Sequence, residues 1–284
     1  MITFSRLGNM GRLGNQFFQV ASTIGIANKN GHSYSFPEWA VNKHLKNKIP
    51  TGFQHADLQI KESGCTYEGF DLECSGEVSI DLSGYFQSEK YFKDSEEEIR
   101  NYLTPSDEIS KIIEEKYGFV FEEDTVSVHI RCGDYRLLST VYHPLNEDYF
   151  LSCIKESGAS KVLFFSDDIN HCKNIFSNEV ENSFFISERA HDLSLISDTK
   201  TAEVDAPKYF KEDLIELFLM SRCRTNIISN STYSWWAAWL NSNDDKQVFA
   251  PDKWFTPQHL ELICPKEYRE NYLDDIIPES WKRR

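Results

Sequence analysis

The chain has 284 residues, of which 40% are hydrophobic, and 30 basic against 45 acidic residues give a net charge of −15. This length predicts one large or two medium domains, and the many aromatic residues can fill sizeable cores. The acidic balance argues against a nucleic-acid partner or an anionic lipid surface held by charge. If the protein binds a phosphate-containing ligand, a few groups concentrated at one site must hold the phosphate.

The cysteines and apolar runs indicate a cytoplasmic protein. The seven cysteines are odd in number, and their only near neighbours, Cys65 and Cys74, do not match a zinc pattern. Several of the cysteines lie in apolar or helical segments, where a reduced cysteine packs as a small hydrophobic residue. No window of about 18 apolar residues occurs, so we expect no membrane-spanning helix and at most peripheral membrane contact.

The chain opens with the outline of a phosphate-binding loop. A short strand is expected at Met1–Leu7, and glycines follow at positions 8, 11 and 14. Gln16–Asn28 then carries apolar residues at helical spacing, which predicts a helix. Strand, glycine loop and helix together can hold a phosphate, although glycine loops also make ordinary tight turns.

A helical region closes the first part of the chain. Ser95 followed by three glutamates is typical of a helix start, because acids stabilise the positive end of the helix dipole. We expect this helix to break near Pro105 and to end at about Tyr117. The acidic patch at 122–124 is the candidate boundary between two domains.

The predicted domains are therefore 1–124 and 125–284, of which the second would bind a nucleotide. Strands and helices alternate in the second part, which predicts an α/β fold with a parallel sheet. Ser187–Pro207 is polar and without pattern, so a surface loop near the cleft is expected there. The expected strands are Thr125–Ile130, Lys161–Phe165 and Asn226–Ser229, and the expected helices are 147–156, 168–177 and 213–223.

The first of these strands carries two cationic or polar side chains on one face. Because side chains alternate along a strand, His129 and Arg131 point one way while the apolar residues between them point the other. Such residues are costly in a central strand unless a partner compensates. Arg131 can fork onto a diphosphate, as its planar geometry favours, or form an internal salt bridge with Asp134.

The second strand ends in Ser166-Asp167-Asp168. An aspartate at this position often caps the following helix. Alternatively, Asp167 or Asp168 accepts hydrogen bonds from a ribose or from the N1–H and amino group of guanine. Both interpretations remain open on the sequence.

The third strand leads into a polar turn and an aromatic helix. Asn230, Ser231 and Thr232 place hydroxyls and free backbone N–H groups at a helix start, which is an anion site. N-capping by Ser231 alone would explain one polar residue but not the whole run. The tryptophans that follow, at 235, 236 and 239, are expected to be core rather than a sugar platform.

Together these groups describe a nucleotide diphosphate pocket. The sequence contains no Walker lysine motif, no paired-acid metal motif, no Gly-x-Ser-x-Gly and no His-Glu-x-x-His. This argues against kinases, metal-dependent transferases and hydrolases, and we expect no metal site.

At these residues the chain resembles the α-1,2-fucosyltransferases of glycosyltransferase family 11. Two further blocks, Phe165–Asp168 and Met220-Ser221, also look like family features. Two departures are visible: Cys132 stands where a second arginine is usual, and Ala237 replaces a glycine. The four matching blocks, in order, are Gly11–Gln19, Gly84–Phe92, His129–Tyr135 and Asn230–Asn241.

The resemblance implies a GT-B-like α/β fold with two Rossmann-like halves and the donor nucleotide site in the C-terminal half. It implies an inverting reaction that moves L-fucose from GDP-β-L-fucose to the 2-hydroxyl of a galactoside. The implied partners are GDP-fucose and a galactose-containing oligosaccharide or glycolipid. No metal and no other cofactor is implied.

Site residues carry over from the matching motifs. His129 and Arg131 look like the strand residues that approach the donor, with Arg131 on the β-phosphate. Asp134 would orient one of these two, and no general base is assigned. Around them, the resemblance gives Asn230, Ser231 and Thr232 as the phosphate-binding helix start, and Arg12, Gly14, Asn15 and Gln16 as a loop that closes on donor and acceptor.

Two other functions remain open. A fucosyltransferase of another linkage, such as 1,6 or protein O-linked, would share the His-x-Arg strand, although the aromatic Ser-Trp-Trp block favours the 1,2 family. A non-catalytic protein that binds a GDP-sugar or a glycan is the alternative from another class.

Overall fold

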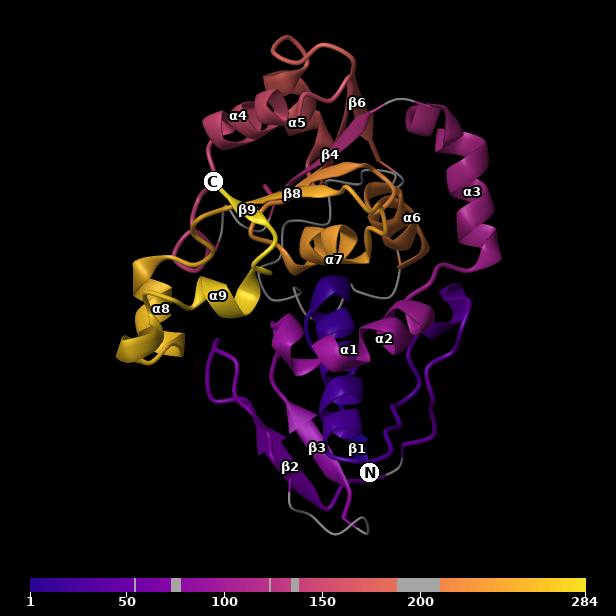
Figure 1. Cartoon of the computed structure of the whole chain (residues 1–284), viewed down its shortest axis with the longest axis vertical. Helices are drawn as coiled ribbons and strands as arrows, with labels where there is room; N and C mark the ends of the chain where they lie inside the picture. Colours follow the sequence, from indigo (N-terminus) through magenta and orange to yellow (C-terminus); the bar gives the residue numbers. More distant parts are fainter. Residues whose placement is uncertain (54, 73–77, 123, 134–137, 188–209) are drawn as a thin grey trace.

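The computed structural model describes residues 1–53, 55–72, 78–122, 124–133, 138–187 and 210–284. It has two bodies, each built around a parallel sheet, with β1 to β3 in the lower one and β4 to β9 in the upper one (Figure 1). The predicted α/β class is therefore confirmed.

The lower sheet has the strand order β1-β3-β2, formed by Ile2–Thr3, Ile80–Ser83 and Leu58–Lys61. β1 is shorter than the strand expected at Met1–Leu7. The chain leaves the sheet because Ser5 turns toward Asp81, whose carboxylate accepts the Ser5 backbone N–H and hydroxyl at 2.7 Å each.

Helix α1 (Leu13–Lys29) lies between this sheet and the upper body (Figure 1). Fourteen of its 17 residues are buried, so it is surrounded rather than amphipathic. Its buried hydroxyls are satisfied within the fold, since Thr23 donates to the Gln19 carbonyl at 2.6 Å and Ser22 to the Phe86 carbonyl at 3.1 Å.

The upper sheet is parallel throughout, in the order β6-β5-β4-β7-β8-β9. The direction of winding reverses between β4 and β7, which are neighbours in the sheet but far apart in the chain. Ligands of open parallel sheets bind outside the carboxyl ends of the strands at such a reversal. The six strands are Thr125–Ile130 (β4), Lys161–Ser166 (β5), Ser183–Ile186 (β6), Thr225–Ile227 (β7), Gln247–Ala250 (β8) and Lys282–Arg283 (β9).

Helices cover both faces of the upper sheet. α4 (Glu147–Ser157) and α5 (Ile169–Phe176) share a core with Val126, Val128 and Ile130 of β4, as the alternation along that strand predicts. α6 (Phe210–Met220) and α7 (Thr232–Leu240) belong to the core on the other side. Ser187 is described, but residues 188–209 of the expected surface loop lie outside the described residues.

Helices from each half reach the other. α2 (Glu96–Tyr102) and α3 (Asp107–Tyr117) flank the predicted break at Pro105, and α3 packs beside α6 (Figure 1). In the opposite direction, α8 (Pro257–Ile263) and α9 (Leu273–Ile276) follow the upper sheet, and Asp275 pairs with Lys90 at 2.6 Å. The division at residue 124 stays a prediction. Short 3-10 helices cover Asn42–His44, Glu89–Tyr91, Lys93–Ser95, Gly118–Glu122 and Lys266–Tyr268.

An aromatic core joins α1 to α7. The Phe18 ring lies 4.5 Å from Trp235 and 5.0 Å from Trp236, and Phe17 lies 5.7 Å from Trp236, centroid to centroid. These tryptophans are fully buried, so the prediction that they form core is confirmed. Burying several rings in one contact strongly favours a fixed arrangement of the two helices.

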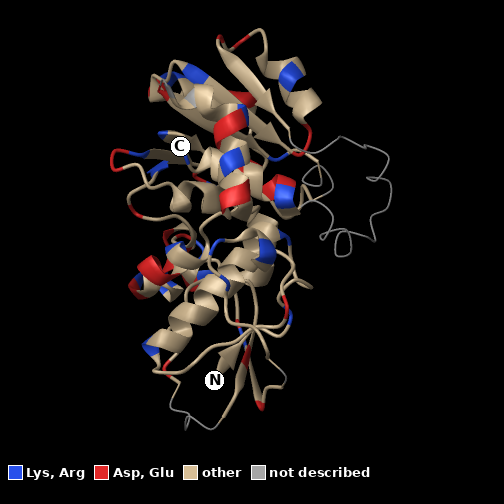
Figure 2. Cartoon of the chain, turned by 90° about the vertical axis from the view of Figure 1, so that its right-hand side faces the viewer, with Lys and Arg blue, Asp and Glu red and all other residues tan. Residues whose placement is uncertain are grey.

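The surface carries both signs of charge. Lys and Arg are interspersed with Asp and Glu over the side shown in Figure 2. None of the helices in the described part of the chain is long and apolar enough to cross a membrane. The six described cysteines are free thiols, and Cys74 lies outside the described residues.

Candidate active site

His129 bridges the two strands at the reversal of the upper sheet. Its Nδ1 lies 3.0 Å from the hydroxyl of Ser229, which follows β7. The ring is only 4% exposed and also faces Tyr233, with 5.3 Å between the ring centroids. Burial, and then the nearby Arg131 charge, lower the pKa of His129 well below its ordinary value. His129 is therefore a neutral hydrogen-bonding group at physiological pH.

Arg131 is held at the end of β4 by Asp167. Its guanidinium lies 3.3 Å from the Asp167 carboxylate, and the two side chains are 13% and 14% exposed. Asp134, the alternative salt-bridge partner, lies outside the described residues. A guanidinium has five N–H donors in a planar fork, so a side chain that keeps some exposure can bind a further anion besides Asp167.

Asp167 organises the turn that follows β4. Its two carboxylate oxygens accept the backbone N–H groups of Cys132 at 2.8 Å and Gly133 at 3.0 Å. A side chain at position 133 would not fit, because a Cβ there would lie 2.6 Å from the carboxylate. Although burial raises the pKa of Asp167, Arg131 and these two hydrogen bonds lower it below its ordinary value. Asp167 is thus ionised and fixes Arg131 in place.

Asp168 caps helix α5. Its carboxylate accepts the backbone N–H of His171 at 3.1 Å, and it occupies the N-cap position. This is the capping role that the sequence left open beside base recognition. The two neighbouring aspartates therefore have different structural partners.

The polar turn before α7 divides its residues between two tasks. Asn230 is 2% exposed and donates to the backbone carbonyls of His143 at 2.8 Å and Trp254 at 2.9 Å, so it fixes the surrounding loops. Ser231 is the N-cap residue of α7, yet its side chain makes no capping hydrogen bond. The Ser231 side chain therefore does not occupy the backbone donors at the start of α7.

The start of α1 rests on the start of α7. A Cβ on Gly14 would lie 2.5 Å from the backbone of Thr232 and Tyr233, so only glycine permits this approach. Asn15 links the two halves, since its Oδ1 accepts the Thr232 hydroxyl at 3.0 Å and the Gln87 amide at 3.0 Å.

Gln16 and Arg12 lie at the same helix start with different exposure. Gln16 is fully buried, donates to the Gly11 carbonyl at 3.0 Å and accepts from the Trp39 indole at 2.8 Å, so it shapes the glycine loop. Arg12 is exposed at the N-cap of α1. Two helix N-termini and Arg12 thus add positive potential to that of Arg131.

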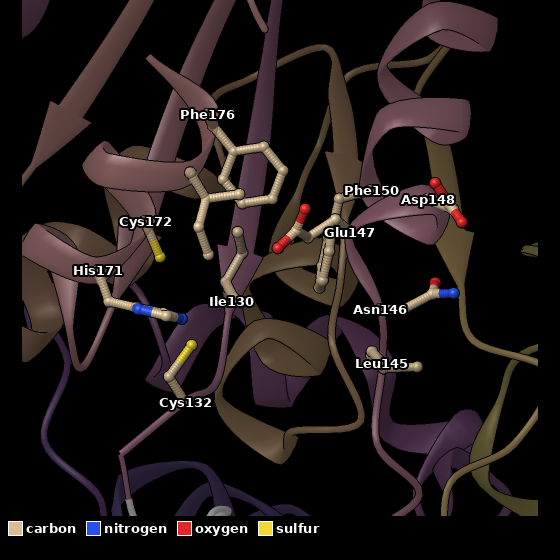
Figure 3. Close-up of a pocket in the computed structure, with 11 residues that line it drawn as sticks. Ile130, Cys132, Leu145, Asn146, Glu147, Asp148, Phe150, His171, Cys172 and Phe176 are labelled. Atoms are coloured by element: carbon tan, nitrogen blue, oxygen red, sulfur yellow. The ribbon is translucent and has the colours of Figure 1, made fainter. Parts of the chain in front are cut away.

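A pocket of about 340 Å³ opens beside the end of β4, between α4 and α5 (Figure 3). Its walls include the apolar side chains of Ile130, Phe150 and Phe176. Glu147 and Asp148, at the start of α4, also line it, and the Glu147 carboxylate points toward its centre (Figure 3).

Sequence reasoning missed several of these residues. Ser229 is the last residue of an expected strand, and strand ends of a parallel sheet are where ligands bind, but the sequence pattern gives it no role beyond the strand. Gln87 lies in a matching family block without an assigned role. Glu147 carries no local signal except its place at a helix start. Within the described ranges, no three His, Cys, Asp or Glu side chains converge to hold a metal ion.

Comparison with known proteins decides the family. The model described as "Glycosyl transferase family 11" matches residues 7–273. The chain belongs to this family. An α-1,2-colitosyltransferase of Escherichia coli is 34% identical over 72% of this chain, and the alignment spans only 62% of that relative's length. A galactoside 2-α-L-fucosyltransferase of Caenorhabditis elegans is 25% identical over 95% of this chain and 74% of its own length.

The fold is shared with solved fucosyltransferases. The NodZ α-1,6-fucosyltransferase of Bradyrhizobium, in a crystal soaked with GDP-fucose, superposes with a TM-score of 0.52 at 15% identity. The match covers 84% of this chain and 91% of NodZ. The predicted GT-B-like architecture is therefore confirmed.

Proposed function

We propose that this protein transfers L-fucose from GDP-β-L-fucose to the 2-hydroxyl of a galactoside, with inversion and without a metal ion. The family and the names of the relatives support glycosyl transfer and the 1,2 linkage. The observation that carries the proposal is the position of Arg131, held by Asp167, after β4 and beside the turn from β7 into α7, whose start touches the start of α1.

The leaving group determines which groups matter. As the bond between C1 of fucose and the diphosphate breaks, negative charge grows on the departing oxygen. Arg131 can donate two parallel hydrogen bonds to it, and the start of α7 offers backbone N–H groups in fixed positions. Groups that are preorganised where charge develops lower the barrier without reorganising. This cationic arrangement supports the proposal that catalysis needs no metal ion.

His129 acts in this scheme as a neutral positioning group. Its low pKa excludes an imidazolium at physiological pH, and its Nδ1 is already engaged with Ser229. It holds the end of β4 against the turn after β7, so that Arg131 and the start of α7 face one phosphate group. A general base for the acceptor hydroxyl is not assigned.

The pocket beside Cys132 suits the guanine base. It is lined in part by flat and branched apolar side chains, and Cys132 directly follows Arg131 in the chain. The Glu147 carboxylate within it can accept the N1–H and amino donors of guanine. Asp167 and Asp168, the acids expected from the sequence to do this, each have partners in the protein already.

A second donor is GDP-colitose, the sugar of which is L-fucose without the 3-hydroxyl. The relative with 34% identity is named as a colitosyltransferase, which favours testing both donors. The two donors share GDP and differ only at the sugar, so the diphosphate contacts proposed above serve either.

The deciding experiment is an acceptor screen with the purified chain. GDP release is measured with GDP-fucose and with GDP-colitose, each with and without a β-galactoside, and the linkage of the product is assigned by NMR. We expect α-1,2 transfer that persists in EDTA. Another linkage, activity that requires added Mn²⁺ or Mg²⁺, or tight GDP binding without turnover would each overturn part of the proposal.

A further inference from the structure

The turn after β3, Gly84–Ser88, belongs to a family block to which the proposed function gives no role. It lies at the carboxyl end of the lower sheet, and Gln87 reaches Asn15 at the start of α1. The turn therefore borders the seam where the two halves meet.

Phe86 has an unfavourable backbone conformation. Its φ is +49°, in the left-handed region that bulky residues rarely adopt. Its ring is fully buried, 5.4 Å from the Tyr91 ring and 6.5 Å from the Phe4 ring. Strain of this kind persists only where the surrounding structure enforces it, and it is concentrated at functional sites.

Glu62 enforces this conformation from the neighbouring strand. Its two carboxylate oxygens accept the backbone N–H groups of Tyr85 at 2.7 Å and Phe86 at 2.9 Å. Gly84 leaves the necessary room, because a Cβ there would lie 2.4 Å from the Glu62 side chain. A carboxylate, a glycine and a buried ring thus fix a single turn.

The result is an outward-facing aromatic ring. Tyr85 is 43% exposed, whereas its neighbour Phe86 is buried and Gln87 is bonded to Asn15. Two residues span at most about 7 Å of chain, so the backbone of Tyr85 lies close to the Asn15 contact and to the start of α7. An exposed ring on a fixed backbone loses little entropy when it binds a ligand.

We propose that Tyr85 is the platform for a pyranose ring of the acceptor, and that Glu62 is the positioning residue that holds this platform. The inference rests on the proposed function. The apolar C–H face of a β-galactoside packs on an aromatic ring, and the phenol hydroxyl can reach a sugar hydroxyl. Tyr85 belongs to the lower body, whereas Arg131 and the start of α7 belong to the upper body.

Glu62 makes the platform sensitive to pH. Burial raises the pKa of Glu62 to about 7, while the Tyr85 and Phe86 hydrogen bonds oppose the shift. The titratable groups that interact with it are Glu68, Cys65 and Tyr91. Below pH 7 the protonated carboxyl loses acceptor capacity for the turn, so the acceptor KM is expected to rise as the pH falls.

The first test replaces the platform. Tyr85→Ala should raise the acceptor KM at least about 10-fold and leave GDP-fucose hydrolysis without acceptor unchanged, whereas Tyr85→Phe should stay within about threefold of wild type. Tyr268→Ala removes a tyrosine that is 53% exposed elsewhere and is the matched control. An unchanged acceptor KM in Tyr85→Ala would overturn the proposal.

The second test separates positioning from stability. Glu62→Gln should raise the acceptor KM at pH 8 and abolish its rise between pH 8 and 6, with donor hydrolysis retained. If Glu62 only stabilises the fold, the melting temperature falls while the pH profile of KM keeps its wild-type shape, and the positioning role is wrong. Failure of the proposed function is distinct, because wild type would then show no transfer at all.

Discussion

The two sides of the proposed diphosphate site obtain positive potential in different ways. At the ends of β4 and β5 it comes from a side chain, Arg131, which needs Asp167 to be tolerated at 13% exposure. At the starts of α1 and α7 it comes from the backbone, and the requirement there is close packing at Gly14. The first side thus depends on the guanidinium chemistry of Arg131. The second depends on the absence of a side chain at Gly14.

Substitution of Arg131 is the strongest test of the side of the site that relies on a charged side chain. Arg131→Ala should lower kcat at least about 100-fold, as for a lost oxyanion donor, and Arg131→Lys should not restore activity because it lacks the planar fork. Steady-state kinetics, GDP affinity and melting temperature are measured together. A folded Arg131→Lys enzyme with near wild-type kcat would show that charge alone suffices.

Gly14→Ala tests the other side of the site, where the starts of α1 and α7 meet. The added methyl would lie 2.5 Å from the Thr232 backbone and must push α1 away from α7. We expect about 1–3 kcal/mol of destabilisation and a roughly 10- to 100-fold loss of kcat from misalignment. The control is Gly118→Ala, where φ is −50° and no atom lies within 4 Å of the new methyl. Equal effects in the two variants would refute the role of the close approach.

Substitutions in the proposed guanine pocket are expected to change donor binding without changing the chemical step. Glu147→Gln should raise the donor KM about 10-fold or more by removing a charged acceptor, with kcat nearly unchanged. Glu179→Gln changes an exposed carboxylate that does not line the pocket and should leave KM at the wild-type value. A larger effect at Glu179 would place the base elsewhere.

The smallest effect is expected at Asp168. Asp168→Ala removes the cap of α5 and should cost about 1 kcal/mol of stability. The donor KM should stay within about twofold, because the carboxylate serves the helix rather than the ligand. Thermal unfolding and donor kinetics check this; an unchanged melting temperature with a raised donor KM would return Asp168 to base recognition.

Several helices and strands on either side of residue 124 were predictable because their signals are local. The expected strand Thr125–Ile130 is β4 to the residue, and the predicted break at Pro105 separates α2 from α3. The Asn226–Ser229 strand was too long, because hydrophobicity cannot show where a ladder ends. β7 stops at Ile227, and Ser229 turns to meet His129.

By itself the sequence determined the α/β class, the family blocks and the shared strand face of His129 and Arg131. Alternation along a strand and the chemistry of guanidinium act over a few residues, so they can be read locally. Only the tertiary structure decided that Asp167 pairs with Arg131, that Asn15 joins Gln87 to Thr232, and that Glu62 holds Tyr85 outward. These partners are between 23 and 217 residues apart in the chain. Strand pairing and packing within each half, and the contact between the halves at Asn15 and Thr232, bring these partners together rather than local propensity.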